Sequence, residues 1–304
     1  MTPDRPVLGI VLMLGFCLLA PIGDSIAKVL GDSVPLGQLV AVRFVLQAAI
    51  LLPLVLLTKR RLRMSARHLI LIALRTALHI VGIGAMFLSL RYLPLADAVA
   101  IAFVMPFIML LLGHVVLHEE VGIRRFAACA VGFIGTLLVI QPNFANVGAP
   151  ALLPLLVAIV FALFMLVTRT IAKATDPVAM QCLSGLMASA VLVPLLALGA
   201  TLDWPGLGVI APAAGDWALM LALGVLGTLA HLLMTWSLRF APSATLAPMQ
   251  YLEIPIATVI GWLAFRDFPN GLALSGIAIT MAAGLYVIAR ERSVSRLPVH
   301  ASTA

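Results

Sequence analysis

Residues 89–94 read Ser-Leu-Arg-Tyr-Leu-Pro, and residues 237–242 read Ser-Leu-Arg-Phe-Ala-Pro. The two stretches lie 148 residues apart. The same shift without gaps pairs Gly113 with Gly261, and each glycine is followed six positions later by an acidic residue. Matching Leu or Ile residues are frequent by chance in an apolar chain, but a shared Ser-Leu-Arg-aromatic-x-Pro run with a Gly-then-acid pairing is not. An internal repeat is therefore predicted, and the alternative is loop chemistry that arose twice.

The composition around this repeat is that of a membrane protein. Of 304 residues, 63% are apolar and 10% are charged, with a mean hydropathy of +1.16. A soluble domain has about 45–50% apolar and about 25% charged residues, so soluble, disordered and collagen-like classes are excluded. The three cysteines, Cys17, Cys129 and Cys182, all lie in apolar runs and are interpreted as buried side chains, not as bridges or metal ligands.

Ten apolar runs have the length of a transmembrane helix, which needs about 20 residues. They cover residues 7–28, 37–57, 69–90, 95–116, 123–140, 151–171, 179–199, 217–238, 244–264 and 270–289. Transmembrane strands would instead show segments of about 10 alternating residues, and the connections are too short for a soluble domain. We expect an all-α membrane protein with ten transmembrane helices.

The basic residues predict the orientation of these helices. Of the 19 Lys and Arg residues, 14 fall on the side of the N-terminus, three on the opposite side (Lys28, Arg91 and Arg266) and two inside spans. Basic residues collect on the cytoplasmic side, so both termini are expected in the cytoplasm. The net charge of +7 is then topological, and no nucleic-acid partner is expected. The first span is too long for a signal peptide and is predicted to stay as a helix.

The repeat unit contains five spans, so the second copy should enter the membrane upside down. We therefore expect two inverted five-helix repeats, residues 7–140 and 151–289, followed by a cytoplasmic tail, residues 290–304. Inverted repeats are typical of secondary transporters, which bind substrate near the midplane between their halves.

The same repeat carries a resemblance to a known family. The first copy comprises residues 93–106, 113–120 and 132–135, and the second comprises residues 242–255, Asp267 and residues 275–284. These motifs resemble the two EamA repeats of the drug/metabolite transporter superfamily, over residues 7–289. The resemblance implies a bacterial inner-membrane protein in which helices 1–4 and 6–9 surround a central cavity.

Two features bear on the subgroup within this superfamily. The run Gly23-Asp24-Ser-Ile-Ala-Lys28 and residues 91–98 are similar to bacterial riboflavin and S-adenosylmethionine permeases. The acidic turns depart from the family pattern, which usually ends in Gly-Glu-Arg: they read Leu-His-Glu-Glu at residues 117–120 and Phe-Arg-Asp at residues 265–267.

Charged groups inside a span are costly and usually face a cavity or a partner. Asp24 lies in the first span, and Arg43 and Gln47 share one face of the second span at a similar depth. Asp24 is a candidate cavity residue. Arg43 is a candidate either to neutralise Asp24 or to bind a carboxylate or phosphate through its planar guanidinium.

Two further spans carry polar side chains on one face. Arg75 and His79 share a face of the third span, and His231 lies near Trp236 in the eighth. They are candidate substrate contacts. The alternatives are an arginine that extends to the interface, a histidine that serves packing, and polar residues that join helices.

The ninth span combines Gln250, Tyr251 and Glu253 with Pro248 and Pro255. Prolines remove backbone donors and bend or open a membrane helix. A carboxylate near the middle of the membrane beside such a break predicts a substrate or proton site, and the alternative is a structural acid bonded to a neighbouring helix.

These observations predict a secondary transporter that moves a small organic metabolite by alternating access, with a riboflavin-like vitamin as the first substrate to test. An exporter of amino acids or drugs is the alternative within the superfamily. A membrane enzyme acting on a lipid-linked substrate and a channel are the alternatives from other classes. No ATP-binding motif, catalytic residue, metal site or cofactor is predicted. The expected partners are the substrate and the lipid bilayer, and a homodimer is compatible with this architecture.

Overall fold

The structure is a computed structural model, and it describes residues 5–60, 62–119, 122–140, 148–202, 204–266 and 271–295. These residues form helices and no strand. The first half contains α1 (Pro6–Leu30), α2 (Leu36–Leu57), α3 (Ala66–Ser89), α4 (Leu95–Ala102), α5 (Met105–Leu117) and α6 (Ile123–Ile140). The second contains the short η1 (Ala149–Leu152), α8 (Leu153–Ala172), α9 (Pro177–Thr201), α10 (Ala214–Phe240), α11 (Ser243–Gln250), α12 (Glu253–Phe265) and α13 (Gly271–Ser295).

Seven helical segments of the described chain are long and apolar enough to cross a bilayer. They are α1, α2, α3, α4 with α5, α8, α9 and α10. The other three predicted ranges fall on α6, on α11 with α12, and on α13. Helix α13 continues to Ser295, into the range expected as a tail, and residues 296–304 lie outside the described residues.

Two of the ranges expected as continuous helices are broken. A turn at Phe103–Val104 separates α4 from α5, and a turn at Tyr251–Leu252 separates α11 from α12. Each bound of α4 and α5 lies 148 residues before the corresponding bound of α11 and α12. A proline in the first turn of α5 and of α12 cannot donate a backbone hydrogen bond across the break. The period read from the sequence therefore also describes the shape of the backbone.

The ends of these broken helices match as well. Pro94 precedes α4 and Pro242 precedes α11, both with extended backbone. His118 ends α5 and Arg266 ends α12, both in the left-handed conformation with φ of 52° and 61°. A left-handed residue is a common helix terminator, and here it fixes the length of both segments.

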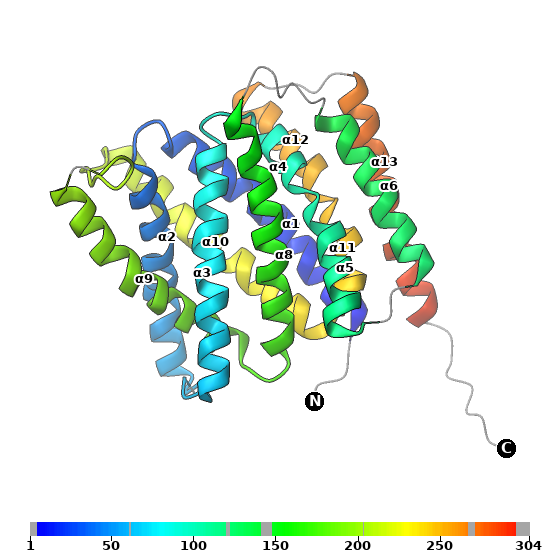
Figure 1. The fold of residues 1–304 in the computed structure, drawn as a ribbon, viewed down its shortest axis with the longest axis horizontal. Helices are drawn as coiled ribbons and strands as arrows, with labels where there is room; N and C mark the ends of the chain where they lie inside the picture. Colours follow the sequence, from blue (N-terminus) through cyan, green and yellow to red (C-terminus); the bar gives the residue numbers. More distant parts are fainter. Residues whose placement is uncertain are drawn as a thin grey trace.

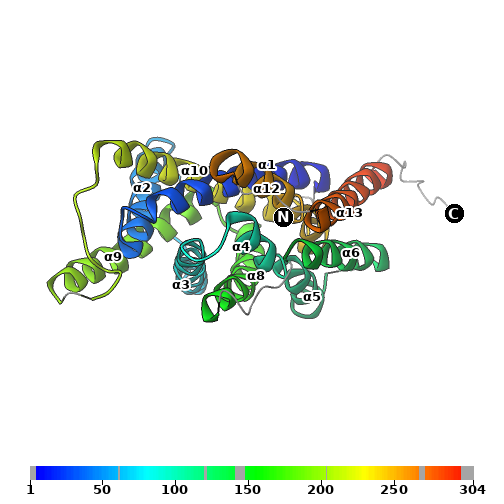
Figure 2. The ribbon, with the colours of Figure 1, turned by 90° about the horizontal axis from the view of Figure 1, so that it is seen from above.

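The helices pack as pairs drawn from the two halves of the chain. Helix α1 packs on α10, α3 on α8, α2 on α9 and α6 on α13. In Figure 2, α1, α10 and α12 lie along one long side and α3, α8 and α5 along the other. Exchanging each helix for its counterpart in the other half reproduces this set of pairs.

Helix α1 begins and α13 ends on the same face of the molecule, which we call the terminal face (Figure 1). Two ion pairs connect the two halves there. Arg169 Nε donates to Glu119 Oε1 at 3.0 Å, with side chains only 9% and 11% exposed, and Arg60 Nη1 donates to Asp176 Oδ2 at 2.5 Å. The opposite face carries the connections α1–α2 and α3–α4.

Candidate functional site

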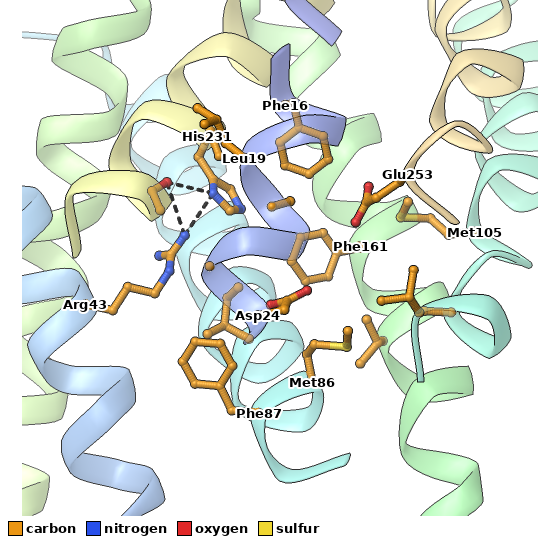
Figure 3. Close-up of a pocket in the computed structure, with 18 of the residues that line it drawn as sticks. Phe16, Leu19, Asp24, Arg43, Met86, Phe87, Met105, Phe161, His231 and Glu253 are labelled. Atoms are coloured by element: carbon orange, nitrogen blue, oxygen red, sulfur yellow. Dashed lines mark hydrogen bonds between the residues drawn. The ribbon is translucent and has the colours of Figure 1, made fainter. Parts of the chain in front are cut away.

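A cavity lies between the two halves of the chain (Figure 3). Side chains of α1, α2, α3, α4, α5, α8, α10 and α12 line it. Its ionisable side chains among the described residues are Asp24, Arg43, His231 and Glu253. The cavity has a volume of about 80 Å³, well below the roughly 300–1,000 Å³ of pockets that hold drug-sized ligands. The helices must therefore move apart before a metabolite can enter.

Arg43 extends from α2 toward α10. Its side chain is 2% exposed, its Nη2 donates to Gly227 O at 3.4 Å, and the same nitrogen lies 2.8 Å from His231 Nδ1. Its Nη1 is buried without a partner in the described part of the chain. Gly227 makes this approach feasible, because a Cβ at that position would lie 2.9 Å from Arg43 Nε. Gly227 thus leaves the space that the Arg43 guanidinium occupies.

His231 and His79 form a tilted ring pair beside Arg43, with an interplanar angle of 35°. Their ring centroids are 4.3 Å apart, and they are 4% and 0% exposed. His231 Nδ1 also lies 2.9 Å from Gly227 O, whereas His231 Nε2 and both ring nitrogens of His79 have no hydrogen-bond partner among the described residues. His79 packs against Phe44 and Phe164 and does not line the cavity.

Arg75 lies one helical turn before His79, and each of its three side-chain nitrogens donates at least one hydrogen bond. Its three nitrogens donate to Thr168 Oγ1 (2.8 Å), Gln181 Oε1 (3.2 Å), Ser184 Oγ (2.8 Å) and Thr235 Oγ1 (3.3 Å). Gln47 joins the same cluster by donating to the Gln181 carbonyl at 2.8 Å. Neither Arg75 nor Gln47 lines the cavity, and together they connect α2 and α3 to the second half.

Two carboxyl groups face the cavity. Glu253 is the first residue of α12, directly after the break, where the free N–H groups of a first helical turn favour a carboxylate. Asp24 lies six residues before the end of α1 and is half-buried. Among the described residues neither carboxylate forms an ion pair with Arg43. The equivalent of Glu253 in the first half, Met105, lines the same cavity (Figure 3).

Three predicted substrate residues lie away from the cavity lining. Gln250 Nε2 lies 3.4 Å from the sulfur of Met109. Tyr251 is fully buried with its ring against Gly132, and its hydroxyl has no partner in the described residues. Trp236 packs on a small apolar cluster of α2, α9 and α10.

The aromatic walls of the cavity were not predicted from the sequence. Phe16, Phe87 and Phe161 line it together with Met86 (Figure 3). A phenylalanine inside an apolar span gives no contrast with its neighbours, so periodicity alone does not mark it. Gly227 offered a weak signal, because it lies four residues before His231 and therefore on the same face of α10.

Comparisons with known proteins agree with this architecture. A riboflavin transporter of Rhizobium johnstonii is 30% identical over 74% of this chain and 72% of its own length. An S-adenosylmethionine uptake transporter of Rickettsia prowazekii is 25% identical over 89% of both chains. A solved crystal structure superposes with a TM-score of 0.69 at 18% identity, over 94% of this chain and 97% of its own, which supports the fold.

The EamA-like transporter family matches residues 7–141 and, separately, residues 149–290. These two segments cover nearly the whole of both predicted repeats. The chain belongs to the EamA-like transporter family and is a secondary transporter of a small metabolite.

Proposed function

We propose that this protein carries a riboflavin-like vitamin across the bacterial inner membrane by alternating access. The observation that carries the proposal is the cavity between the two halves, which has aromatic walls and ionisable groups and lies at the two helix breaks. A planar heteroaromatic solute fits aromatic walls, and the ionisable groups that line the cavity supply the hydrogen bonds that fix its orientation.

The architecture in this proposal is ten transmembrane helices in two inverted five-helix halves, residues 7–140 and 151–289. Two observations support it: the breaks of α4–α5 and α11–α12 keep one period of 148 residues, and the helix pairs persist when the halves are exchanged. An odd number of spans per half inverts the second copy, and broken helices at the substrate site are a recurring feature of such carriers.

In this proposal the terminal face is cytoplasmic. The 14 basic residues on that side support this orientation. Asp24 and Arg43 then lie nearer the external face, whereas the ion pairs Glu119–Arg169 and Arg60–Asp176 close the cytoplasmic side. Opening toward the cytoplasm requires that both pairs break.

The predicted substrate residues divide into groups on this basis. Asp24, Arg43, His231 and Glu253 contact the substrate, and Glu253 also carries the coupling proton. Gln47, Arg75 and His79 hold the contacting side chains in place. Trp236, Gln250 and Tyr251 serve packing, which is a narrower site than the sequence alone predicts.

S-adenosylmethionine is the second candidate substrate, because relatives that bear this name match as much of the chain. Its ammonium and sulfonium groups fit the carboxyl groups of Asp24 and Glu253. Export of amino acids or drugs is the alternative direction and substrate class.

Growth of a riboflavin auxotroph at limiting vitamin tests the proposal. Expression of the chain should restore growth and cell-associated riboflavin, and an Arg43→Ala variant present at the same level in the membrane should not. Labelled S-adenosylmethionine is supplied in a parallel uptake assay. Absence of riboflavin uptake by a protein that is folded and inserted would refute the vitamin as substrate, and uptake in the parallel assay would identify the second candidate.

A further inference from the structure

We propose that Arg43 and His231 form a two-donor site that binds an acceptor group of the ligand, either a carboxylate or a pair of ring carbonyls, at one end of the cavity. The proposal deepens the transport function proposed above, because it assigns a direction to the ligand within the cavity. It stands on hydrogen-bond geometry at three atoms: Arg43 Nη2, His231 Nδ1 and Gly227 O.

The tautomer of His231 depends on the groups that lie next to its Nδ1. A guanidinium has only donors and stays charged in proteins, and Arg43 Nη2 lies 2.8 Å from His231 Nδ1. His231 Nδ1 also lies 2.9 Å from Gly227 O, to which a hydrogen on Nδ1 would donate. We assign Nδ1 as the acceptor, because a hydrogen there would face the charged donor Arg43 Nη2 at 2.8 Å, whereas Gly227 O also receives Arg43 Nη2 at 3.4 Å. A neutral imidazole then carries its hydrogen on Nε2. Arg43 is thus a positioning residue for His231 as well as a binding residue.

Two nitrogens of this pair remain available to a ligand. Arg43 Nη1 and His231 Nε2 are buried donors without a partner among the described residues, and both side chains line the cavity. A buried donor without an acceptor is unfavourable, so this corner of the cavity favours a ligand that brings acceptors. A planar group with two acceptor oxygens matches the planar guanidinium.

The two ends of the cavity differ in the hydrogen-bonding groups that they carry. Figure 3 shows Arg43 and His231 on one side and Glu253 on the other, with Phe16 and Phe161 between them. An ionised carboxylate only accepts hydrogen bonds. The cavity therefore fits a ligand with an acceptor end, an aromatic body and a donor or cationic end.

Neighbouring residues hold Arg43 and His231 in this orientation. His79 packs on the His231 ring at 4.3 Å. On the other side Gly227 leaves the space for Arg43 that a Cβ would fill. His79 lies inside the long helix α3 and Gly227 inside the long helix α10. The donor pair is therefore held in place before a ligand binds.

Equilibrium binding to the purified full chain in lipid nanodiscs tests the proposal with simple probes. The carboxylate probe is 3-phenylpropionate, the neutral dicarbonyl probe is lumichrome, and the matched probe with the opposite charge is 3-phenylpropylamine. The wild type should bind at least one acceptor probe, and which one it binds distinguishes a carboxylate ligand from a ring-carbonyl ligand. Binding of neither acceptor probe overturns the proposal.

Substitutions at His231 separate the donor function from ring packing. His231→Gln keeps an acceptor for Arg43 and a donor for the ligand, so affinity should stay within about threefold of wild type. His231→Phe keeps the ring and removes both nitrogens, and Arg43→Lys keeps the charge and removes the planar pair of donors. Each should weaken acceptor binding by about tenfold or more, the effect of losing one charge-assisted hydrogen bond.

The controls keep this result interpretable. Arg67→Lys, at an exposed position in the first turn of α3 on the terminal face, should leave binding unchanged, and the unfolding temperature of each variant without ligand reports its folding. If His231→Phe and Arg43→Lys bind acceptor probes as wild type does, or if the amine probe binds best, the donor pair is refuted. A chain that binds phenylpropionate through Arg43 but takes up no riboflavin would refute the vitamin substrate and keep the donor pair.

Discussion

The two broken helices have the same backbone and different chemistry. The break between α4 and α5 carries Phe103 and is followed by Met105, whereas the break between α11 and α12 carries Tyr251 and is followed by Glu253. Met105 and Glu253 occupy equivalent positions and both line the cavity. The 148-residue period therefore preserves the shape of the backbone but not the side chains at the site. One break supplies an apolar wall of the cavity and the other supplies an ionisable group.

The largest effect is expected when the ionisable break is neutralised. Glu253→Gln should lower riboflavin uptake by about tenfold or more, because a hydrogen bond to a charged group is lost, and should remove any response to a pH gradient. Met105→Leu, which conserves volume, should change uptake by less than about twofold. Uptake into proteoliposomes with and without a pH gradient measures both. Equal behaviour of the two variants would refute a special role for the acidic break.

Packing behind the second break should be the next most sensitive feature. A Cβ at Gly132 of α6 would lie 2.6 Å from the Tyr251 ring. Gly132→Ala should therefore lower the free energy of unfolding by about 1–3 kcal/mol, as expected for overpacking. Gly84→Ala is the control, since a Cβ there has nothing within 4 Å. Thermal or denaturant unfolding in micelles measures the difference, and an equally mild response of both variants would contradict the tight contact.

Tyr251→Phe gives the two breaks the same aromatic residue, because Phe103 is the equivalent residue. The hydroxyl of Tyr251 is buried without a partner in the described residues, and removing such a group should leave the free energy of unfolding unchanged or raise it by up to about 1 kcal/mol. Riboflavin uptake should not change. A clear loss of uptake would return Tyr251 to the substrate site, where the sequence alone placed it.

The smallest effect is expected at a pair of equivalent glycines beyond the breaks. A Cβ at Gly261 of α12 meets nothing within 4 Å, whereas a Cβ at Gly113 of α5 would lie 3.1 Å from Glu119 Oε2. Alanine inside a helix is favoured over glycine by about 0.5–1 kcal/mol, so Gly261→Ala should stabilise the protein by that amount and Gly113→Ala should not. Unfolding curves of the two variants measured side by side test this, and equal gains would contradict the crowding at Glu119.

Much of the fold follows from the sequence because a bilayer imposes simple rules. Span length and the Pro-marked turns at Pro94 and Pro242 predict where the helices lie, and the 148-residue period coincides with the positions of both breaks. The partners of each helix could not be predicted in this way. Apart from a few polar positions such as Arg43 and Gln47, helices α2 and α9 carry apolar residues on all sides, so the periodicity of the apolar residues does not distinguish the face that meets protein from the face that meets lipid.

The site was partly predictable because charged side chains are rare inside membrane spans. Asp24, Arg43, His231 and Glu253 stand out against an apolar background, and the structure brings all four to one cavity. Sequence alone does not separate Arg43 from Arg75, because both arginines lie at similar distances from the end of a predicted span. Only the neighbours distinguish them: Arg75 donates to side chains of α8, α9 and α10, whereas Arg43 Nη1 has no acceptor in the part of the chain that the structure describes.

The equal lengths of the broken segments have a consequence for passage through the protein. Helices α4 and α11 have eight residues each, and α5 and α12 have thirteen. At 1.5 Å per residue these lengths are about 12 Å and about 20 Å. Helix α4 starts from the face opposite the termini and α11 from the terminal face (Figure 1), so the short segment of each broken helix lies toward a different face of the molecule. A nearly symmetric backbone therefore presents Met105 at the break nearer one face and Glu253 at the break nearer the other, and in the transport route proposed above a solute meets an apolar side chain and a carboxyl group at different depths.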